Sequence, residues 1–176
     1  MSFSVSIIFN LCTIEGTSER PTEEKSTSDN LTVKQVYGIV FSNDGRVLLR
    51  IEDNRYKLTG RKPELNETFE ETLKREYVEE LNVELEECYY LGYLLVEENN
   101  EKYVQVRMIG KIKRINNKRA DTDTGKIYER KLVNVSNVKK YLKYNDEAGN
   151  LMIDDAIYMA NSKYNFSELN QNEEIV

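Results

Sequence analysis

Short apolar runs separated by turn residues dominate the first third of the chain. Residues 4–12 (SVSIIFNLC) and 33–41 (VKQVYGIVF) are rich in Val, Ile and Phe, which is typical of strands. A Ser-Asn-Asp-Gly turn at 42–45 follows the second run and leads into 46–52 (RVLLRIE). Because Asp-Gly is a strong hairpin signal, we expect the runs on either side of this turn to pair with each other.

The hydrophobic period lengthens from two to four after residue 68. Apolar side chains recur every fourth residue, at Phe69, Leu73, Tyr77 and Leu81. This spacing predicts an amphipathic helix. Thr68 is followed by Glu71 three residues later, which is the pattern of a capping box, so we expect the helix to begin at Thr68.

The second half of the chain predicts more strands and two short helices. We expect strands at 89–97, 103–115 and 126–133, a polar loop (DTDTG) at 121–125, and helices at 137–144 and 151–161. The loop is too short for an EF-hand, so we interpret it as a polar turn rather than a calcium site. Strands on both sides of one capped helix, with another helix near the end, indicate an α+β fold.

A polar segment separates the first strand from the rest of the chain. Residues 15–30 are charged and contain a proline, which is typical of a linker or exposed loop. We therefore expect an N-terminal strand and polar linker (1–30), a main domain (31–165) and a polar, frayed tail (166–176). The first strand is expected to pair with a sheet edge of this chain or of a second copy, so a homodimer stays open.

Composition narrows the class of protein and the available chemistry. The 176 residues are 39% hydrophobic and 32% charged, which fits a soluble globular domain. The net charge of −6 argues against binding of a nucleic acid polymer. There is no histidine, which excludes Ser-His and Cys-His catalysis and leaves carboxylates, Lys, Tyr and metal ions.

Cysteine usage and hydropathy bear on the compartment. Cys12 and Cys88 are too few for a disulfide framework and favour a reducing compartment, so we expect a cytoplasmic protein. No apolar run approaches the ~18 residues needed to span a membrane, so no membrane association is expected. The first apolar run has no basic leader before it, which argues against a secretory signal.

Three glutamates on the predicted helix are the candidate chemistry. Glu76, Glu79 and Glu80 stand at relative positions 0, +3 and +4 and therefore repel one another on one side of the helix. At about 100° per residue, Glu76 and Glu80 overlap the apolar stripe, so they are expected to face the protein body. Buried carboxylates are costly without a counter-ion, which favours a hard divalent cation among them. The alternative is an acidic face open to solvent.

The residues around these glutamates carry a family resemblance. The stretch 60–83 (GRKPELNETFEETLKREYVEELNV) resembles the Nudix box of the Nudix hydrolases, Gly-x5-Glu-x7-Arg-Glu-U-x-Glu-Glu-x-Gly-U, with U aliphatic or aromatic. The matching residues are Glu67, Arg75, Glu76, Tyr77, Glu79, Glu80 and Val83.

Two glycine positions depart from the pattern. Asn82 replaces the late glycine and can adopt the left-handed conformation that ends a helix. Arg61 occupies the first position, with Gly60 directly before it, so the loop is expected to be shifted or strained.

The resemblance implies a fold and an activity. It implies a Nudix-type α/β/α sandwich with a mixed sheet, and metal-dependent hydrolysis of a pyrophosphate bond in a nucleoside diphosphate derivative. A nucleoside triphosphate, a nucleotide sugar and a dinucleotide all remain open as the small nucleotide substrate. The alternative is a catalytically silent Nudix domain that binds a nucleotide or a protein partner, which Arg61 favours.

The resemblance also implies roles for residues. Glu76, Glu79 and Glu80 match the ligands of Mg²⁺ or Mn²⁺, and Glu67 matches a position that pairs with Arg75. The family often adds a fourth carboxylate from a later loop, for which the candidates are Asp121, Asp123, Glu129, Asp146 and Glu147. No motif identifies the substrate-binding residues. Arg50 and Arg107 are candidates for phosphate contacts, although solvated side chains are the favoured interpretation for both. Any of several tyrosines on predicted strands is a candidate for base stacking.

Overall fold

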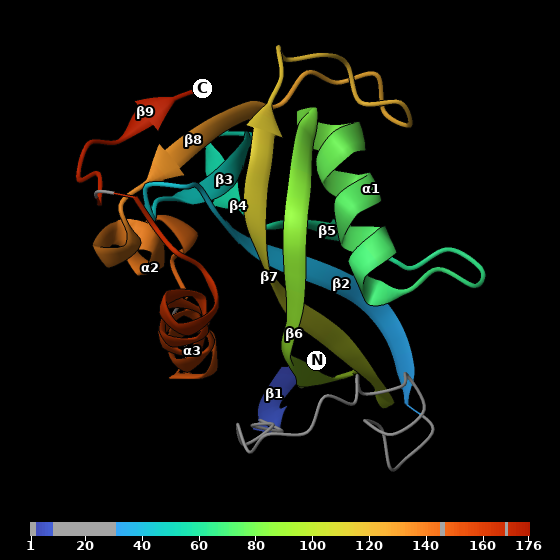
Figure 1. Ribbon diagram of the computed structural model, residues 1–176. Helices are drawn as coiled ribbons and strands as arrows, with labels where there is room; N and C mark the ends of the chain where they lie inside the picture. The colour runs from blue at the N-terminus through green and yellow to red at the C-terminus, as the bar shows by residue number, and fades with distance from the viewer. Residues whose placement is uncertain (1–2, 9–30, 145–146, 168) are drawn as a thin grey trace.

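The computed structural model describes residues 3–8, 31–144, 147–167 and 169–176 (Figure 1). Within these residues the strands are β1 (Phe3–Ile8), β2 (Thr32–Phe41), β3 (Val47–Glu52), β4 (Arg55–Lys57), β5 (Thr59–Arg61), β6 (Val83–Glu98), β7 (Glu101–Ile115), β8 (Glu129–Val133) and β9 (Glu174–Ile175). The helices are α1 (Phe69–Leu81), a 3-10 turn (Val135–Asn137), α2 (Val138–Leu142) and α3 (Glu147–Lys163). No helix in these ranges is both long enough and apolar enough to cross a membrane.

All of the described strands join one mixed sheet. Its order is β1-β6-β7-β2-β3-β8-β9, with β4 paired to β3 and β5 paired to β2. The β2–β7 pair is parallel, and the other strand pairs in the described ranges are antiparallel. Helix α1 covers one face of the sheet, and α2 and α3 cover the other (Figure 1). The expected α/β/α sandwich is therefore confirmed.

Apolar side chains of β2 point to both faces of the sheet, which explains why helices pack on each face. Val36 and Val40 belong to the hydrophobic core beneath α1, together with Leu73 of that helix. Ile39 and Phe41 belong to the second core, beneath α3. Because successive side chains of a strand point to opposite faces, one apolar run contributes to both cores.

Helix α1 begins and ends as the sequence predicts. The Thr68 side chain accepts from the Glu71 backbone N–H, and the Glu71 side chain accepts from the Thr68 backbone N–H, which completes the capping box. At the other end, Asn82 adopts the left-handed conformation, with φ of 51°. Asn82 therefore does the backbone work of the glycine that is absent from this position.

The other departure from the box is resolved by the position of Gly60. Gly60 lies on β5 opposite Tyr37 of β2, and a Cβ atom there would lie 2.0 Å from the Val36 carbonyl oxygen. Arg61 does not have a positive φ, so the strain expected at this residue is absent. The close approach of two strands requires glycine at residue 60, and Arg61 follows in ordinary extended backbone.

The N-terminal strand pairs within the chain. β1 lies antiparallel to β6, with Phe3 opposite Glu98 and Ile8 opposite Tyr93. This confirms the first of the two pairings left open above. The predicted linker, at 15–30, and Cys12 lie outside the described residues.

The prediction of a frayed tail is wrong. β9 pairs with β8, and Arg46 forms an ion pair with Glu174. Glu173 accepts hydrogen bonds from Tyr141 and Asn137 and forms an ion pair with Lys131. The polar side chains of the tail therefore form ion pairs and hydrogen bonds with residues of the sheet and α2.

Candidate active site

Helix α1 buries two of the three predicted glutamates. Glu76 is 0% exposed and Glu80 is 7% exposed, whereas Glu79 is half-buried. Glu76 and Glu80 are one turn apart, on the side of the helix that also carries Leu73 and Tyr77 into the core. The expected burial of these two carboxylates is thus observed.

Arg75 holds the acids of the helix and the preceding loop together. Its Nε and Nη2 atoms donate to both oxygens of Glu67, at 2.7 and 3.0 Å. Its Nη1 atom donates to Glu76 at 2.5 Å and to Glu79 at 2.9 Å. These hydrogen bonds from Arg75 lower the pKa of Glu67 to about 2. The Glu67–Arg75 pair implied by the resemblance is present, and it fixes the loop at residues 62–68 against α1.

Glu80 has a different cationic neighbour. Its Oε1 atom lies 2.5 Å from Nη1 of Arg50, on β3. Arg50 also stacks on the ring of Tyr128, 4.7 Å from the ring centroid. The sheet therefore supplies a positive charge to the carboxylate that the helix buries.

These arginines leave part of each carboxylate without a partner. Oε2 of Glu76 and Oε2 of Glu80 are buried, and neither accepts a hydrogen bond. Burial raises the pKa of Glu80 to about 7, against the attraction of Arg50, and burial also raises the pKa of Glu76. Two buried, unpartnered carboxylate oxygens at one site cost free energy unless a cation binds them.

The carboxylate oxygens fit a hard divalent cation that has few protein ligands. Among the residues described, no three or more acidic or sulfur-bearing side chains are gathered closely enough to ligate one ion. Mg²⁺, however, is usually held by one or two carboxylates, with water and substrate phosphate completing its shell. The free Oε2 atoms of Glu76 and Glu80 match that requirement.

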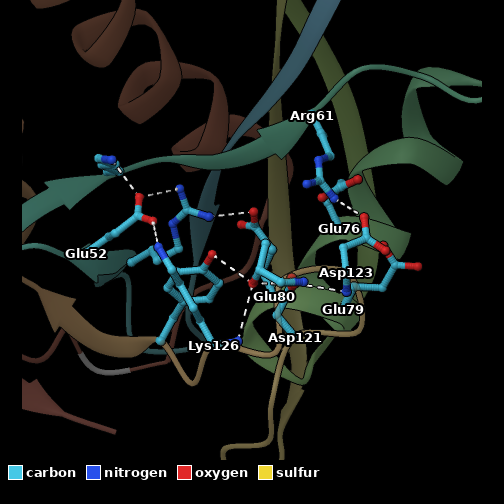
Figure 2. Close-up of polar contacts among 12 residues, drawn as sticks. Glu52, Arg61, Glu76, Glu79, Glu80, Asp121, Asp123 and Lys126 are labelled. Carbon is cyan, nitrogen blue, oxygen red and sulfur yellow. Dashed lines mark hydrogen bonds and ion pairs between the residues drawn. The ribbon is translucent and has the colours of Figure 1, made fainter.

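The loop before β8 brings two more carboxylates to this region. Asp123 pairs with Arg61, and both lie beside Glu76 in Figure 2. Asp121 is buried, and its Oδ1 atom accepts from the Thr124 backbone, the Thr124 hydroxyl and the Asp123 backbone. Burial by itself would raise the pKa of Asp121, but these hydrogen bonds outweigh it and lower the pKa. Asp121 therefore carries a negative charge close to Glu80.

The other candidates for a fourth carboxylate are less well placed. Glu129 is exposed and pairs with Lys118, and Glu147 is exposed at the first turn of α3. Asp146 lies outside the described residues. Of the four candidates that the structure describes, Asp121 and Asp123 are the two that lie near the glutamates of α1.

A cavity of about 690 Å³ opens beside Glu80. Its cationic lining residues are Arg50, Lys57, Arg61, Arg107 and Lys126. Three of them converge on Glu52, whose carboxylate lies 2.6 Å from Lys57, 3.5 Å from Arg50 and 3.4 Å from Lys126. In the view of Figure 2, Glu80 lies between this Glu52 cluster and Glu76. The cavity is large enough for a nucleotide, and its lining carries more positive than negative charge.

The comparisons with known proteins agree with this fold. The Bacillus subtilis pyrophosphohydrolase BsRppH matches with a TM-score of 0.60 and 19% identity, over 92% of each chain. A NUDIX hydrolase from Nitrosomonas europaea matches with a TM-score of 0.54 and 19% identity, over 80% of this chain and 98% of its own. The MutT structure described for Aliivibrio salmonicida and Vibrio cholerae matches at 0.51 and 16% identity, over 70% of this chain and 94% of its own. The chain has the Nudix fold. No protein-family model and no curated protein sequence matches it.

Within the Nudix fold, two arginines differ from their predicted state. Arg50 has a side chain that is 13% exposed, and Arg107 is 5% exposed, so the solvated interpretation is wrong for both. Both stand on strand positions whose side chains face the cavity, together with Tyr37 of β2. The period-two pattern of β2 and β7 could have placed Tyr37 and Arg107 on one face. It could not have shown that the face is open at this end.

Glu52, Lys57 and Lys126 were missed at the sequence level. They come from the end of β3, from β4 and from the loop before β8, and they meet only because β3 pairs with β4 and the loop folds back over them. No local motif marks them. A charged side chain at the end of a strand is otherwise an ordinary surface residue.

Proposed function

We propose that the chain is a metal-dependent Nudix pyrophosphohydrolase that cleaves the pyrophosphate bond of a nucleoside diphosphate derivative. The observation that carries this proposal is the pair of buried, unpartnered Oε2 atoms of Glu76 and Glu80 beside a cation-lined cavity. A plain structural helix would gain nothing from burying two like charges one turn apart. The shared fold with pyrophosphohydrolases supports the same conclusion.

Glu76 and Glu80 would hold Mg²⁺ or Mn²⁺, with Glu79 sharing a metal or orienting a water molecule. When bound, the metal supplies Lewis acidity to the phosphate oxygens and lowers the pKa of a bound water. The chain itself contributes the rigid carboxylate positions. Arg75 anchors Glu76 and Glu79 from one side through its guanidinium, which also ties them to Glu67. Asp121 is held ionised close to Glu80 and would add to the negative charge that attracts the metal.

The cations around the cavity would bind the phosphate chain. Arg50, Lys57 and Lys126 pair with Glu52, and Arg50 also pairs with Glu80, so these three cations face two carboxylates and one positive charge remains to be neutralised. A guanidinium can hold a phosphate with two hydrogen bonds, and lysine ammonium groups add charge without fixed geometry. Substrate phosphates would therefore lie between the Glu52 cluster and the carboxylates of α1.

The silent alternative loses its main support from the sequence. It rested on Arg61 as a strained replacement for glycine, and the Arg61 backbone is unstrained. What still favours it is that arginines already occupy part of each carboxylate, as at Arg50 and Glu80. The experiment must therefore separate turnover from binding.

The test is a nucleotide panel with Mg²⁺ or Mn²⁺, read by phosphate or pyrophosphate release. We expect turnover of at least one nucleoside diphosphate derivative, and a loss of at least about 100-fold in kcat for Glu80→Gln, as is usual for removal of a group that stabilises transition-state charge. Glu70→Gln is the matched control, because Glu70 is an exposed glutamate of the same helix that pairs with Lys74. Equal turnover by Glu80→Gln and the parent would refute the metal site. Nucleotide binding without turnover by any substrate would favour the silent domain.

A further inference from the structure

One part of the cavity lining is a polar patch on the sheet that the proposed chemistry does not use. On the face of the sheet toward α3, Gln35 and Tyr37 of β2 stand opposite Gln105 and Arg107 of β7 in the parallel register. We call these four residues the floor patch. The next pair on the same face, Ile39 and Ile109, is fully buried in the apolar core. An apolar sheet face therefore changes to hydrogen-bonding side chains where it reaches the cavity.

Arg107 is the least compensated member of the floor patch. It is 5% exposed and stacks on the ring of Tyr37, 4.7 Å from the centroid. Its hydrogen bonds go to the Val106 carbonyl, the Gln105 side chain and the Met152 sulfur. In the part of the chain that the structure describes, no carboxylate pairs with Arg107. A guanidinium has five N–H donors, and a thioether is a weak acceptor, so buried donor capacity remains beside the cavity.

The amides of the floor patch are oriented by this arginine. Gln105 accepts from Arg107 through Oε1, at 2.9 Å, and donates through Nε2 to Oε1 of Gln35, at 3.0 Å. The chain of hydrogen bonds therefore runs in one direction, from Arg107 to Gln35. It leaves the Nε2 donors of Gln35 for a ligand. The floor patch thus offers donors at both ends and calls for a ligand edge that presents acceptors.

The composition of the patch distinguishes it from the cluster of cations and carboxylates around Glu52 and Glu80. The lysines and the α1 carboxylates lie around Glu52 and Glu80, whereas the floor patch has two amides, one aromatic ring and one buried guanidinium. An aromatic ring with fixed hydrogen-bond donors suits a heteroaromatic base. Among the purines, guanine presents two adjacent acceptors, O6 and N7, to which arginine can donate in a bidentate manner. Adenine presents an amino donor in place of O6 and would oppose the Arg107 donors.

We propose that the floor patch is a base-binding subsite selective for 6-oxopurines, in which Arg107 reads the O6 and N7 acceptors. This inference rests on the proposed function only for the position of the phosphates. Base selectivity is a property of binding and does not require turnover. Hypoxanthine shares O6 and N7 with guanine and lacks its 2-amino group, so it isolates the contact assigned to Arg107.

The first experiment measures binding without catalysis. The full chain is titrated calorimetrically in EDTA with GMP, IMP and AMP. We expect GMP and IMP to bind with similar affinities, and AMP to bind at least about tenfold more weakly. Arg107→Met should remove the preference, and Arg107→Lys should restore little of it, because a lysine cannot make the bidentate contact. Arg114→Met is the matched control, since Arg114 is on the same strand but exposed and paired with Glu84. Equal binding of AMP and GMP by the parent would overturn the proposal.

The second experiment separates this proposal from the hydrolase assignment. With Mn²⁺, kcat/KM for GTP and ITP should exceed that for ATP, and Arg107→Met should act through KM while kcat changes little. Selective binding of GMP and IMP without hydrolysis of any nucleotide would reject the enzyme and retain the subsite. Hydrolysis at equal kcat/KM for GTP, ITP and ATP would retain the enzyme and reject the subsite. Thermal melts of each variant establish that it folds, and retention of the GMP preference by a folded Arg107→Met variant would also overturn the assignment.

Discussion

Replacing Glu80 by glutamine should make the metal-free protein more stable at neutral pH. Glu80 is 7% exposed, and its buried Oε2 atom has no partner, so the ionised side chain is costly even with Arg50 beside it. Glutamine keeps the shape and removes the charge. The expected gain is therefore a direct measure of the electrostatic cost that a metal would offset.

The size and sign of the effect follow from the pKa. Burial raises the pKa of Glu80 from 4.5 to about 7. Between these values the folded protein keeps a proton that the unfolded chain has released, so stability falls as the pH rises. At about 1.4 kcal/mol for each pH unit, the full loss is about 3 kcal/mol and is complete above pH 7. Glu80→Gln has no such proton, so its advantage over the parent should grow by about 3 kcal/mol from pH 4.5 to pH 8.

The assay is urea unfolding in EDTA at closely spaced pH values, followed by circular dichroism. Titrating groups shared by the two proteins cancel in the difference between their unfolding free energies. Glu70→Gln, at the exposed position on the same helix, should give a difference that is small and nearly constant with pH. Added Mn²⁺ at pH 8 should stabilise the parent more than Glu80→Gln, by about 2.7 kcal/mol at a metal concentration 100 times Kd.

A flat difference between Glu80→Gln and the parent from pH 4.5 to pH 8 would refute this reasoning. It would mean that Glu80 is ionised in water-like surroundings in the folded protein. An equal stabilisation of both proteins by Mn²⁺ would separately refute the role of Glu80 as a ligand.

Three further predictions concern the fold around the site. Gly60→Ala should destabilise the protein by about 3 kcal/mol or more in urea unfolding, because its Cβ would meet the Val36 carbonyl at 2.0 Å; a loss under 1 kcal/mol would contradict this contact. Asn82→Ala should cost about 1–2 kcal/mol, since alanine tolerates the left-handed conformation poorly, whereas Asn82→Gly should cost less than Asn82→Ala in the same measurement. Glu173→Gln should lower the unfolding free energy by about 1 kcal/mol at pH 7. Burial opposes the shift, but Tyr141 and Lys131 lower the pKa of Glu173 to about 2, so the difference should shrink as the pH falls from 4.5 to about 2, and a difference that is constant with pH would argue against these contacts.

The local features of the site could be predicted because they depend on neighbours in the chain. The capping box at Thr68, the left-handed Asn82 and the inward side of Glu76 and Glu80 follow from helix geometry over 15 residues or so. The Glu67–Arg75 pair followed only from the family resemblance. What all these features share is a short separation along the chain.

The predictions that were wrong, and the residues that were missed, depend on contacts between segments distant in sequence. The tail was predicted to fray because its sequence is polar, yet Glu173 meets Lys131 and Tyr141 through the fold. Glu52 meets Lys126 across 74 residues of sequence. Arg107 is buried by α3, which packs on a strand face that the sequence alone left unassigned. Long-range contacts of this kind leave no periodic signal in the chain.

The parallel ladder between β2 and β7 has a consequence for the kinetics of folding. Gln35 and Gln105 are 70 residues apart, and β3, α1 and β6 lie in the chain between the two strands. Closing so long a loop is entropically costly and is rewarded only late in folding. We therefore expect the base-binding face to be among the last surfaces to assemble, so that a refolding chain would regain its helical signal before it regains the capacity to hold a ligand.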